Sequence, residues 1–154
     1  MEIKREILNA IIQKLEETLD LTIEQSNMAK DASINTPGRN ESSYDSSKEE
    51  MAHLANSFSK KALKIENEIK KLRNFSILEN KEKVTLGSLV EININNNDQF
   101  VFLTPCSGGQ KIEVGDMRIF TINKEAPISS VIFGKKIGET ARFNGKLITI
   151  KNIE

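Results

Sequence analysis

The first half of the chain contains two runs of apolar residues with helical spacing. The first run is Leu8, Ile11, Leu15 and Leu19, separated by three or four residues each. The second run continues this spacing further and consists of Met51, Leu54, Phe58, Ala62, Ile65, Ile69 and Leu72. Such intervals are typical of the buried seam of a coiled coil. The pattern therefore predicts two amphipathic helices.

Pro37-Gly38 separates the two runs and is the strongest helix-breaking pair in this half. The flanking arms, residues 2–33 and 43–74, have 32 residues each. Each arm would extend about 48 Å at the helical rise of 1.5 Å per residue. Equal arms around a short turn predict an antiparallel hairpin. The seam becomes small and polar toward the turn, which predicts that the tip, about residues 34–43, is a surface presented to a partner.

The second half consists of short runs typical of β-strands, separated by turn residues. The predicted strands are residues 88–94, 99–104, 116–122, 140–143 and 146–153. Asn144-Gly145 is the strongest signal for a two-residue hairpin turn. Pro127 and Gly134 bound a short predicted helix. The fold class is therefore α+β: a helical hairpin over residues 1–75, followed over residues 76–154 by a small antiparallel β domain with one short helix.

Composition narrows the function classes. The 22 basic and 22 acidic residues give a formal net charge of zero, so no bulk attraction to nucleic acid is expected. No apolar stretch is long enough to span a membrane, and the charged N-terminus lacks a signal-peptide pattern. The single cysteine, Cys106, excludes an internal disulfide and fits a reducing compartment. We expect a cytoplasmic protein without a membrane partner. Cys106 and the lone histidine, His53, lie in different predicted domains, so a thiol enzyme is not expected.

Three segments resemble GreA/GreB transcript-cleavage factors. Residues 126–153 (APISSVIFGKKIGETARFNGKLITIKNI) resemble the C-terminal signature of that family, with Glu139 at the position of the usual aspartate. Residues 84–90 (VTLGSLV) resemble the segment that opens the same domain, and residues 44–50 (YDSSKEE) the start of the second coiled-coil helix. The three segments occur in the family's order and on the corresponding elements. The compact ending is most similar to the small Gre-like proteins of Bacteroidetes.

The resemblance implies a fold and a partner. It implies an FKBP-like C-terminal domain that docks on the rim of the secondary channel of core RNA polymerase, while the coiled coil enters the channel. Pro127, Ile128, Lys135 and Lys136 are then the candidates for docking. Contact with nascent RNA would be indirect, and a monomer is expected. The protein would not be an enzyme itself, and at most it would stimulate the intrinsic RNA cleavage of the polymerase.

The resemblance also implies a role for carboxylates at the tip. In cleavage factors, acidic tip residues help to hold a second Mg²⁺ in the polymerase active site, and carboxylate oxygens are the ligands this ion prefers. In this chain the family's aspartate position falls on Pro37 and its glutamate position on Asn40. The remaining acidic candidates are Glu41, Asp45 and Asp31. We expect no stably bound metal or cofactor, and any Mg²⁺ would be shared with the polymerase through Glu41.

Several alternatives stay open at this point. The acidic tip residues could instead cap the second helix and solubilise the turn. The protein could be a non-cleaving, inhibitory or regulatory occupant of the channel. It could also be an FKBP-like chaperone or isomerase, although the chain has no tryptophan and only one tyrosine for an aromatic pocket. A coiled-coil adaptor for another partner is the remaining alternative.

Overall fold

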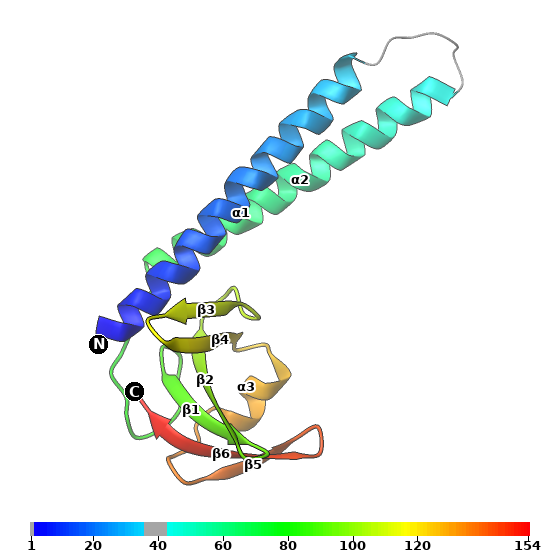
Figure 1. Ribbon diagram of the computed structural model, residues 1–154. Helices are drawn as coiled ribbons and strands as arrows, with labels where there is room; N and C mark the ends of the chain where they lie inside the picture. The colour runs from blue at the N-terminus through cyan, green and yellow to red at the C-terminus, as the bar shows by residue number, and fades with distance from the viewer. Residues whose placement is uncertain (1, 36–42) are drawn as a thin grey trace. The chain divides into compact units, whose positions relative to one another are not determined.

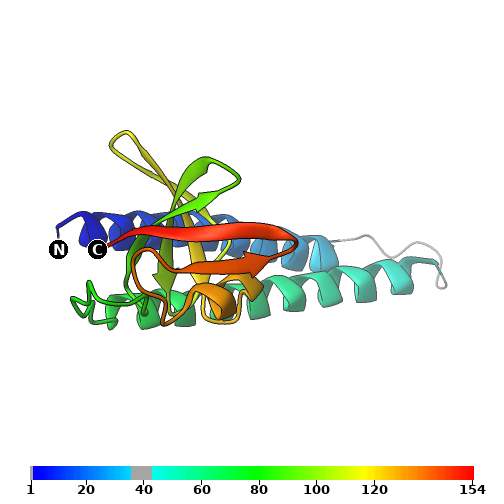
Figure 2. The ribbon, with the colours of Figure 1, turned by 90° about the horizontal axis from the view of Figure 1, so that it is seen from below.

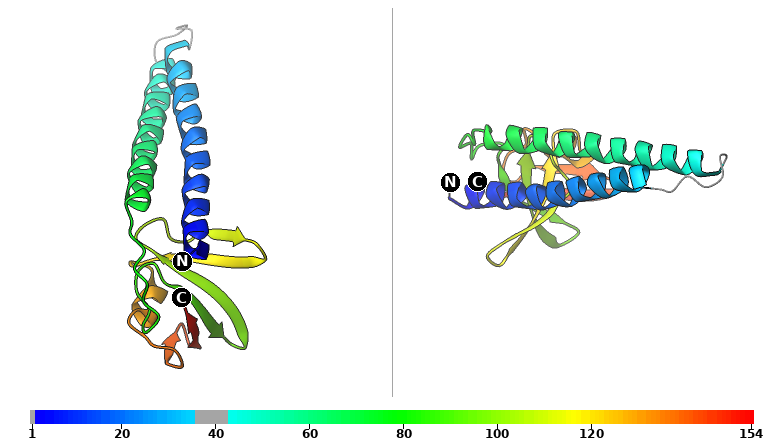
Figure 3. Two further views of the ribbon diagram at one scale, coloured as in Figure 1. Left: turned by 90° about the vertical axis from the view of Figure 1, so that its left-hand side faces the viewer. Right: turned by 90° about the horizontal axis from the view of Figure 1, so that it is seen from above.

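The computed structural model describes residues 2–35 and 43–154. Two long helices come first, α1 (Glu2–Asn35) and α2 (Ser43–Arg73), and they run antiparallel to one another (Figures 1 and 3). The hairpin predicted from the apolar periodicity is confirmed. A six-stranded sheet and one short helix, α3 (Pro127–Ile132), complete the α+β fold.

The seam of α2 differs from the predicted one at a single position. Leu54 is 43% exposed, whereas its neighbour Ala55 is only 3% exposed. The apolar seam positions therefore alternate in steps of four and three without interruption: Met51, Ala55, Phe58, Ala62, Ile65, Ile69 and Leu72. A regular heptad repeat keeps one face of the helix toward its partner, and it excludes Leu54 from that face. The prediction of Leu54 as a seam residue was wrong, because Ala55, and not Leu54, continues the regular four-and-three spacing of the buried positions.

The seam of α1 changes character along its length, as the sequence predicts. Near the start of the helix the buried residues are large, with Ile7 and Ile11 completely inaccessible. Further along, the buried residues are Thr22, Ser26 and Ala29. The Thr22 hydroxyl donates a 2.7 Å hydrogen bond to the Thr18 carbonyl of its own helix, which satisfies this polar group within α1. Little apolar area is buried in this part of the hairpin.

The sheet is mixed. Its strands are β1 (Leu89–Ile94), β2 (Asn97–Thr104), β3 (Lys111–Val114), β4 (Met117–Asn123), β5 (Thr140–Phe143) and β6 (Lys146–Ile153). They lie in the order β3-β4-β2-β1-β6-β5. Strands β2 and β4 pair in parallel, while the other four pairings are antiparallel. The sequence had predicted a purely antiparallel sheet and had placed no strand at residues 111–114.

The parallel pair follows from the loop between β2 and β3. The amide of Gly109 donates to the Thr121 carbonyl at 2.6 Å, and the amide of Thr121 donates to the Gln110 carbonyl at 2.9 Å. The loop is thereby fixed against β4. A β-carbon on Gly108 would lie 2.6 Å from the backbone nitrogen of Asn123, so only glycine permits this approach. The chain then continues as β3 on the far side of β4, and β4 is left to pair with β2.

Two tight turns agree with the expected turn chemistry. Asn144 and Gly145 have φ angles of 50° and 75°, and they join β5 to β6. Positive φ at both central positions is the requirement of a type I′ hairpin turn. Asn95 and Asn96, with φ angles of 52° and 63°, join β1 to β2 in the same way.

A buried cluster fills the space between the sheet and α3. Ile132 of α3 packs with Val101 and Leu103 of β2 and with Ile148 and Ile150 of β6. Figures 1 and 2 show α3 alongside the strands of this half of the sheet. The short helix begins with Pro127 at its first position, where a missing N–H costs nothing. The cluster therefore fixes the segment that carries the C-terminal sequence signature.

The chain forms two compact units. One comprises Met1–Ile12 and Lys71–Glu154, and the other comprises Gln13–Lys70. The first unit thus contains the sheet, α3, the start of α1 and the end of α2. Lys4 is 3% exposed in this unit. Burial lowers the pKa of its amine, an effect that the nearby carboxylates of Glu79 and Glu154 oppose.

Candidate functional site

The acidic candidates of the hairpin tip are only partly within the described residues. Pro37, Asn40 and Glu41 lie outside them. Asp45 is in the first turn of α2. Asp31 is exposed in the last turns of α1. Their role at the tip therefore stays a prediction.

The described residues show no cluster of metal ligands. Among the side chains that the structure describes, in residues 2–35 and 46–154, no three His, Cys, Asp or Glu are close enough to hold a metal ion together. At the two positions where the resemblance to Gre factors implies tip carboxylates, this chain has Pro37, which has no side-chain donor, and Asn40, which offers only a neutral carbonyl oxygen. Glu41 is the neighbouring residue that offers a carboxylate, and the sharing of an Mg²⁺ through it stays a prediction.

Two of the resembling segments are joined directly in the structure. The amide of Val84 donates a 2.8 Å hydrogen bond to the Lys135 carbonyl, and the amide of Gly134 donates one of the same length to the Val84 carbonyl. Val84 itself is completely buried in the α3 cluster. The segment 84–90 and the signature around α3 are thus one structural feature, although about 40 residues separate them in sequence. Sequence order alone gave no indication of this contact.

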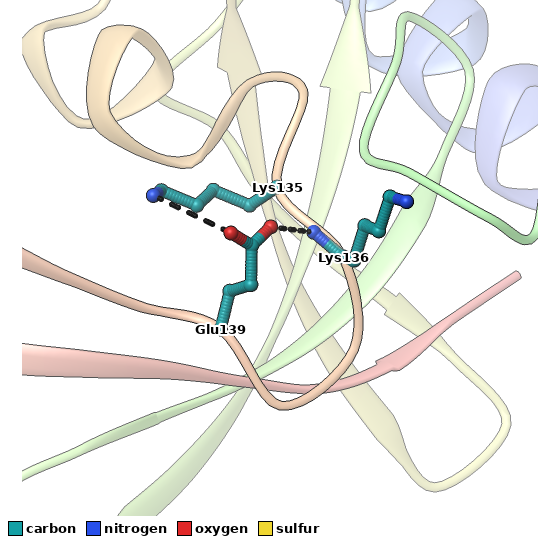
Figure 4. A network of polar contacts seen from close by, with 3 residues as sticks. All are labelled: Lys135, Lys136 and Glu139. Atoms are coloured by element: carbon teal, nitrogen blue, oxygen red, sulfur yellow. Dashed lines mark hydrogen bonds and ion pairs between the residues drawn. The ribbon is translucent and has the colours of Figure 1, made fainter.

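A carboxylate organises the turn after α3. Glu139 accepts a 2.6 Å hydrogen bond from the Lys136 amide through one oxygen, and its other oxygen lies 3.9 Å from the Lys135 ammonium (Figure 4). The Glu139 amide in turn donates to the Lys136 carbonyl at 3.1 Å. The Glu139 carboxylate thus contacts the backbone of Lys136 and the side chain of Lys135. The two lysine side chains point in different directions: that of Lys135 faces Glu139, while that of Lys136 points away from it (Figure 4).

The four predicted docking residues have different exposures. Pro127 and Lys136 are exposed, and Lys135 is half-buried. Ile128 packs against the α3 cluster, so part of its surface is occupied within the domain. Phe133 and Ile137 flank the same turn and are among the exposed large apolar residues. These two residues are not among the four that the sequence motif predicts.

A groove runs along one flank of the hairpin, and the sequence analysis did not predict it. It has a volume of about 360 Å³ and lies entirely within the unit Gln13–Lys70. Its lining residues are Ile23, Ser26, Asn27 and Lys30 of α1, together with Ser59, Ala62, Leu63 and Glu66 of α2. The small residues Ser26, Ser59 and Ala62 leave the space that larger seam residues would fill. The change from large to small seam residues was the signal that could have predicted it.

His53 and Cys106 have ordinary surroundings. His53 is exposed on α2, and its carbonyl accepts a hydrogen bond from the Ser57 hydroxyl. Cys106 is a half-buried free thiol in the loop after β2, and its carbonyl accepts a 2.8 Å hydrogen bond from the Thr104 hydroxyl. The two residues belong to different compact units, and neither is part of the groove.

Comparison with known proteins gave matches to solved structures only. No family model matches the sequence, and no curated protein matches it. The fold superposes on a crystal structure of GreA factor homolog 1 (Gfh1) from Thermus thermophilus with 16% identity and a TM-score of 0.39, covering 94% of this chain and 95% of that one. A structure of Gfh1 from Thermus aquaticus gives 20% identity and a TM-score of 0.36, covering 95% of each chain. A further structure, described as the transcription factor Gfh1, gives 16% identity and 0.39, covering 94% of each chain.

One general property concerns membranes. Among the residues that the structure describes, neither long helix has the length of apolar sequence that crossing a bilayer requires.

Proposed function

We propose that this chain is an RNA polymerase secondary-channel factor that modulates transcription elongation. The observation that carries the proposal is the resemblance of residues 126–153 to the C-terminal Gre signature. Those residues form α3, the Glu139-centred turn and the β5–β6 hairpin. Segment 84–90, which resembles a second part of the same family, is hydrogen-bonded to this turn through Val84. A long antiparallel hairpin precedes them, as the family order requires.

The two parts of the molecule have separate roles in this proposal. The C-terminal domain docks on the rim of the channel through the exposed residues around α3, with Pro127 and Lys136 among the contacts. The hairpin enters the channel. With 34 residues, α1 extends about 50 Å at the helical rise, which suits a probe that acts at a distance from its docking site.

The chemistry of the tip favours a regulator that occupies the channel. Metal-assisted phosphodiester cleavage needs hard oxygen ligands for the recruited ion. Pro37 and Asn40 stand where the family has its carboxylates, and Glu41 is the nearest acidic residue in sequence. Glu41 therefore decides whether this chain stimulates cleavage in addition to occupying the channel.

Binding to purified core polymerase tests the proposal. The full chain, labelled at Cys106, is titrated with core enzyme, and we expect a dissociation constant in the micromolar range or tighter. No binding at that concentration would overturn the proposed function.

Cleavage is measured separately on stalled elongation complexes supplied with Mg²⁺. If the chain stimulates cleavage, Glu41→Ala abolishes the release of short 3′ RNA fragments, while the control Glu49→Ala, at an exposed position of α2, retains it. If wild type releases no fragments yet binds and slows elongation, the chain is a non-cleaving regulator.

A further inference from the structure

The turn between β5 and β6 contains the one Asn-Gly pair of the chain, Asn144 and Gly145. Both residues are exposed and have positive φ angles of 50° and 75°. Strand pairing ends at Phe143 and Lys146, so the Gly145 amide lies outside the ladder of β5 and β6. Apart from its chain neighbours, no heavy atom of the described residues lies within 4 Å of the position that a β-carbon on Gly145 would take. The reactive groups of both residues are therefore open to water.

An asparagine followed by glycine can undergo deamidation, and asparagine is among the thermolabile residues. The Gly145 nitrogen gives its proton to water and forms a bond to Cγ of Asn144, while the side-chain amino group takes up a proton and leaves as ammonia. The resulting succinimide ring is opened by water at either of its two carbonyl groups, which leaves aspartate or isoaspartate at position 144. Glycine favours this attack because it has no β-carbon beside the attacking nitrogen.

We propose that Asn144 is a site of spontaneous deamidation and that pairing of the β5–β6 hairpin controls its rate. The ladder holds Asn144 and Gly145 in the left-handed region that a type I′ turn requires. Ring closure imposes a different ψ angle on Asn144, so the turn must open locally before the Gly145 nitrogen reaches Cγ. The reaction is thus slow in the paired hairpin and faster in the opened one. This inference is independent of the proposed function.

The two products affect the hairpin differently. Aspartate keeps the length of the backbone and tolerates positive φ, so the turn forms again. Isoaspartate carries the main chain through its β-carbon and adds one carbon to the backbone of a two-residue turn. Phe143 and Lys146 then no longer face one another, and β5 loses its register on β6. Because β5 is four residues long and β6 is its single neighbour in the sheet, no other strand holds it in place (Figure 1).

A second turn of the same chain provides a matched control. Asn95 and Asn96 join β1 to β2, are exposed and have φ angles of 52° and 63°. The two turns differ in the residue that follows the first asparagine, which is Asn96 in one and Gly145 in the other. Gly145→Asn therefore reproduces a turn that the chain already forms. Asn96→Gly transfers the reactive pair to the other turn.

Incubation of the full chain at neutral pH tests the site. Peptide mapping by mass spectrometry should show a carboxylate replacing the side-chain amide at Asn144 but not at Asn95. Ion-exchange chromatography should show the same conversion, because each event adds one negative charge to a chain of formal net charge zero. Gly145→Asn should abolish conversion at Asn144, and Asn96→Gly should create it at Asn95. Equal conversion of Asn95 and Asn144 in wild type, or undiminished conversion in Gly145→Asn, would refute the proposal.

Control of the rate by the hairpin is tested by repeating the incubation in urea. Conversion at Asn144 should be faster in the unfolded chain, and equal rates in both states would show that the hairpin does not protect the site. The isoaspartate form, recognised by enzymatic methylation, should lose amide-exchange protection in β5, while Asn144→Asp should retain it. Retained protection of β5 in the isoaspartate form would refute the effect on register.

Discussion

The hydroxyl groups of Ser26 and Ser59 lie 3.0 Å apart across the seam of the hairpin. The Ser26 hydroxyl also donates a 3.3 Å hydrogen bond to the Ala55 carbonyl of α2. A serine has one proton to donate, so Ser59 must be the donor in the pair with Ser26. The distal part of the hairpin is therefore joined by directed polar contacts at a point where little apolar area is buried.

These contacts predict that substitution of Ser26 lowers the free energy of unfolding more than substitution of Ser59. Ser26→Ala removes both hydrogen bonds and should lower the free energy of unfolding by about 1 kcal/mol, the usual net value of such a bond. Ser59→Ala should cost less, because Ser59 is exposed and its loss leaves the bond from Ser26 to Ala55 intact. Urea unfolding followed by circular dichroism measures both. A larger loss for Ser59→Ala than for Ser26→Ala would contradict the assignment of donors.

The register of α2 predicts opposite outcomes at two adjacent positions. Leu54→Ala should change the free energy of unfolding by no more than about 0.5 kcal/mol, as for other surface substitutions. Ala55→Leu should destabilise by about 1 to 3 kcal/mol, because the larger side chain has no space between the helices. Thermal unfolding of the two variants would distinguish them. If Leu54→Ala is the more harmful change, the seam follows the apolar residues of the sequence and not the heptad repeat seen in the structure.

The turn after α3 predicts that stability depends on a hydrogen-bond acceptor at position 139. Glu139→Ala removes the acceptor for the Lys136 amide and the partner of Lys135, and it should cost about 1 kcal/mol. Glu139→Gln keeps a neutral acceptor and should recover part of this stability. The exposed ion pair with Lys135 contributes little by comparison. Amide hydrogen exchange at Lys136 reports the loss locally, and unchanged protection in Glu139→Ala would show that the bond does not form in solution.

Burial of Lys4 predicts a pH-dependent stability. Because the pKa is lowered in the folded state, the unfolded chain binds more protons between that value and 10.5. The free energy of unfolding should therefore rise as the pH increases from the lowered pKa of Lys4 toward 10.5. Lys4→Met should stabilise the protein at neutral pH, where the ammonium must be desolvated, and its advantage over wild type should shrink as the pH approaches 10.5. An advantage that stays constant with pH would exclude titration of Lys4 as the cause.

The sequence predicted the helices and strands of this fold better than it predicted which strands pair. Helical periodicity located both arms, and the turn residues Asn144-Gly145 located the final hairpin within the observed bounds. These signals are local, because they depend on residues a few positions apart. The parallel pairing of β2 with β4 depends on the path of the loop around Gly108, which periodicity cannot encode.

In the candidate site, too, local features could be predicted from the sequence, whereas contacts between separate segments could not. Pro127 and Lys136 were selected from a contiguous motif, and the structure places both at the surface. The contact of Val84 with Gly134 and Lys135, and the groove between Ile23 and Leu63, join residues from separate segments. Neither could be derived from spacing along the chain, because each depends on how two elements pack together.

The position of β3 and β5 has a consequence for how this protein behaves at high concentration. The order of the strands makes these two the outer edges of the sheet, and each is only four residues long. Lys111, Glu113 and Arg142 are exposed along them. Short edges with charged side chains resist strand-to-strand pairing between molecules. The same chain path that places β4 beside β2 thus protects the sheet from aggregation through its edges.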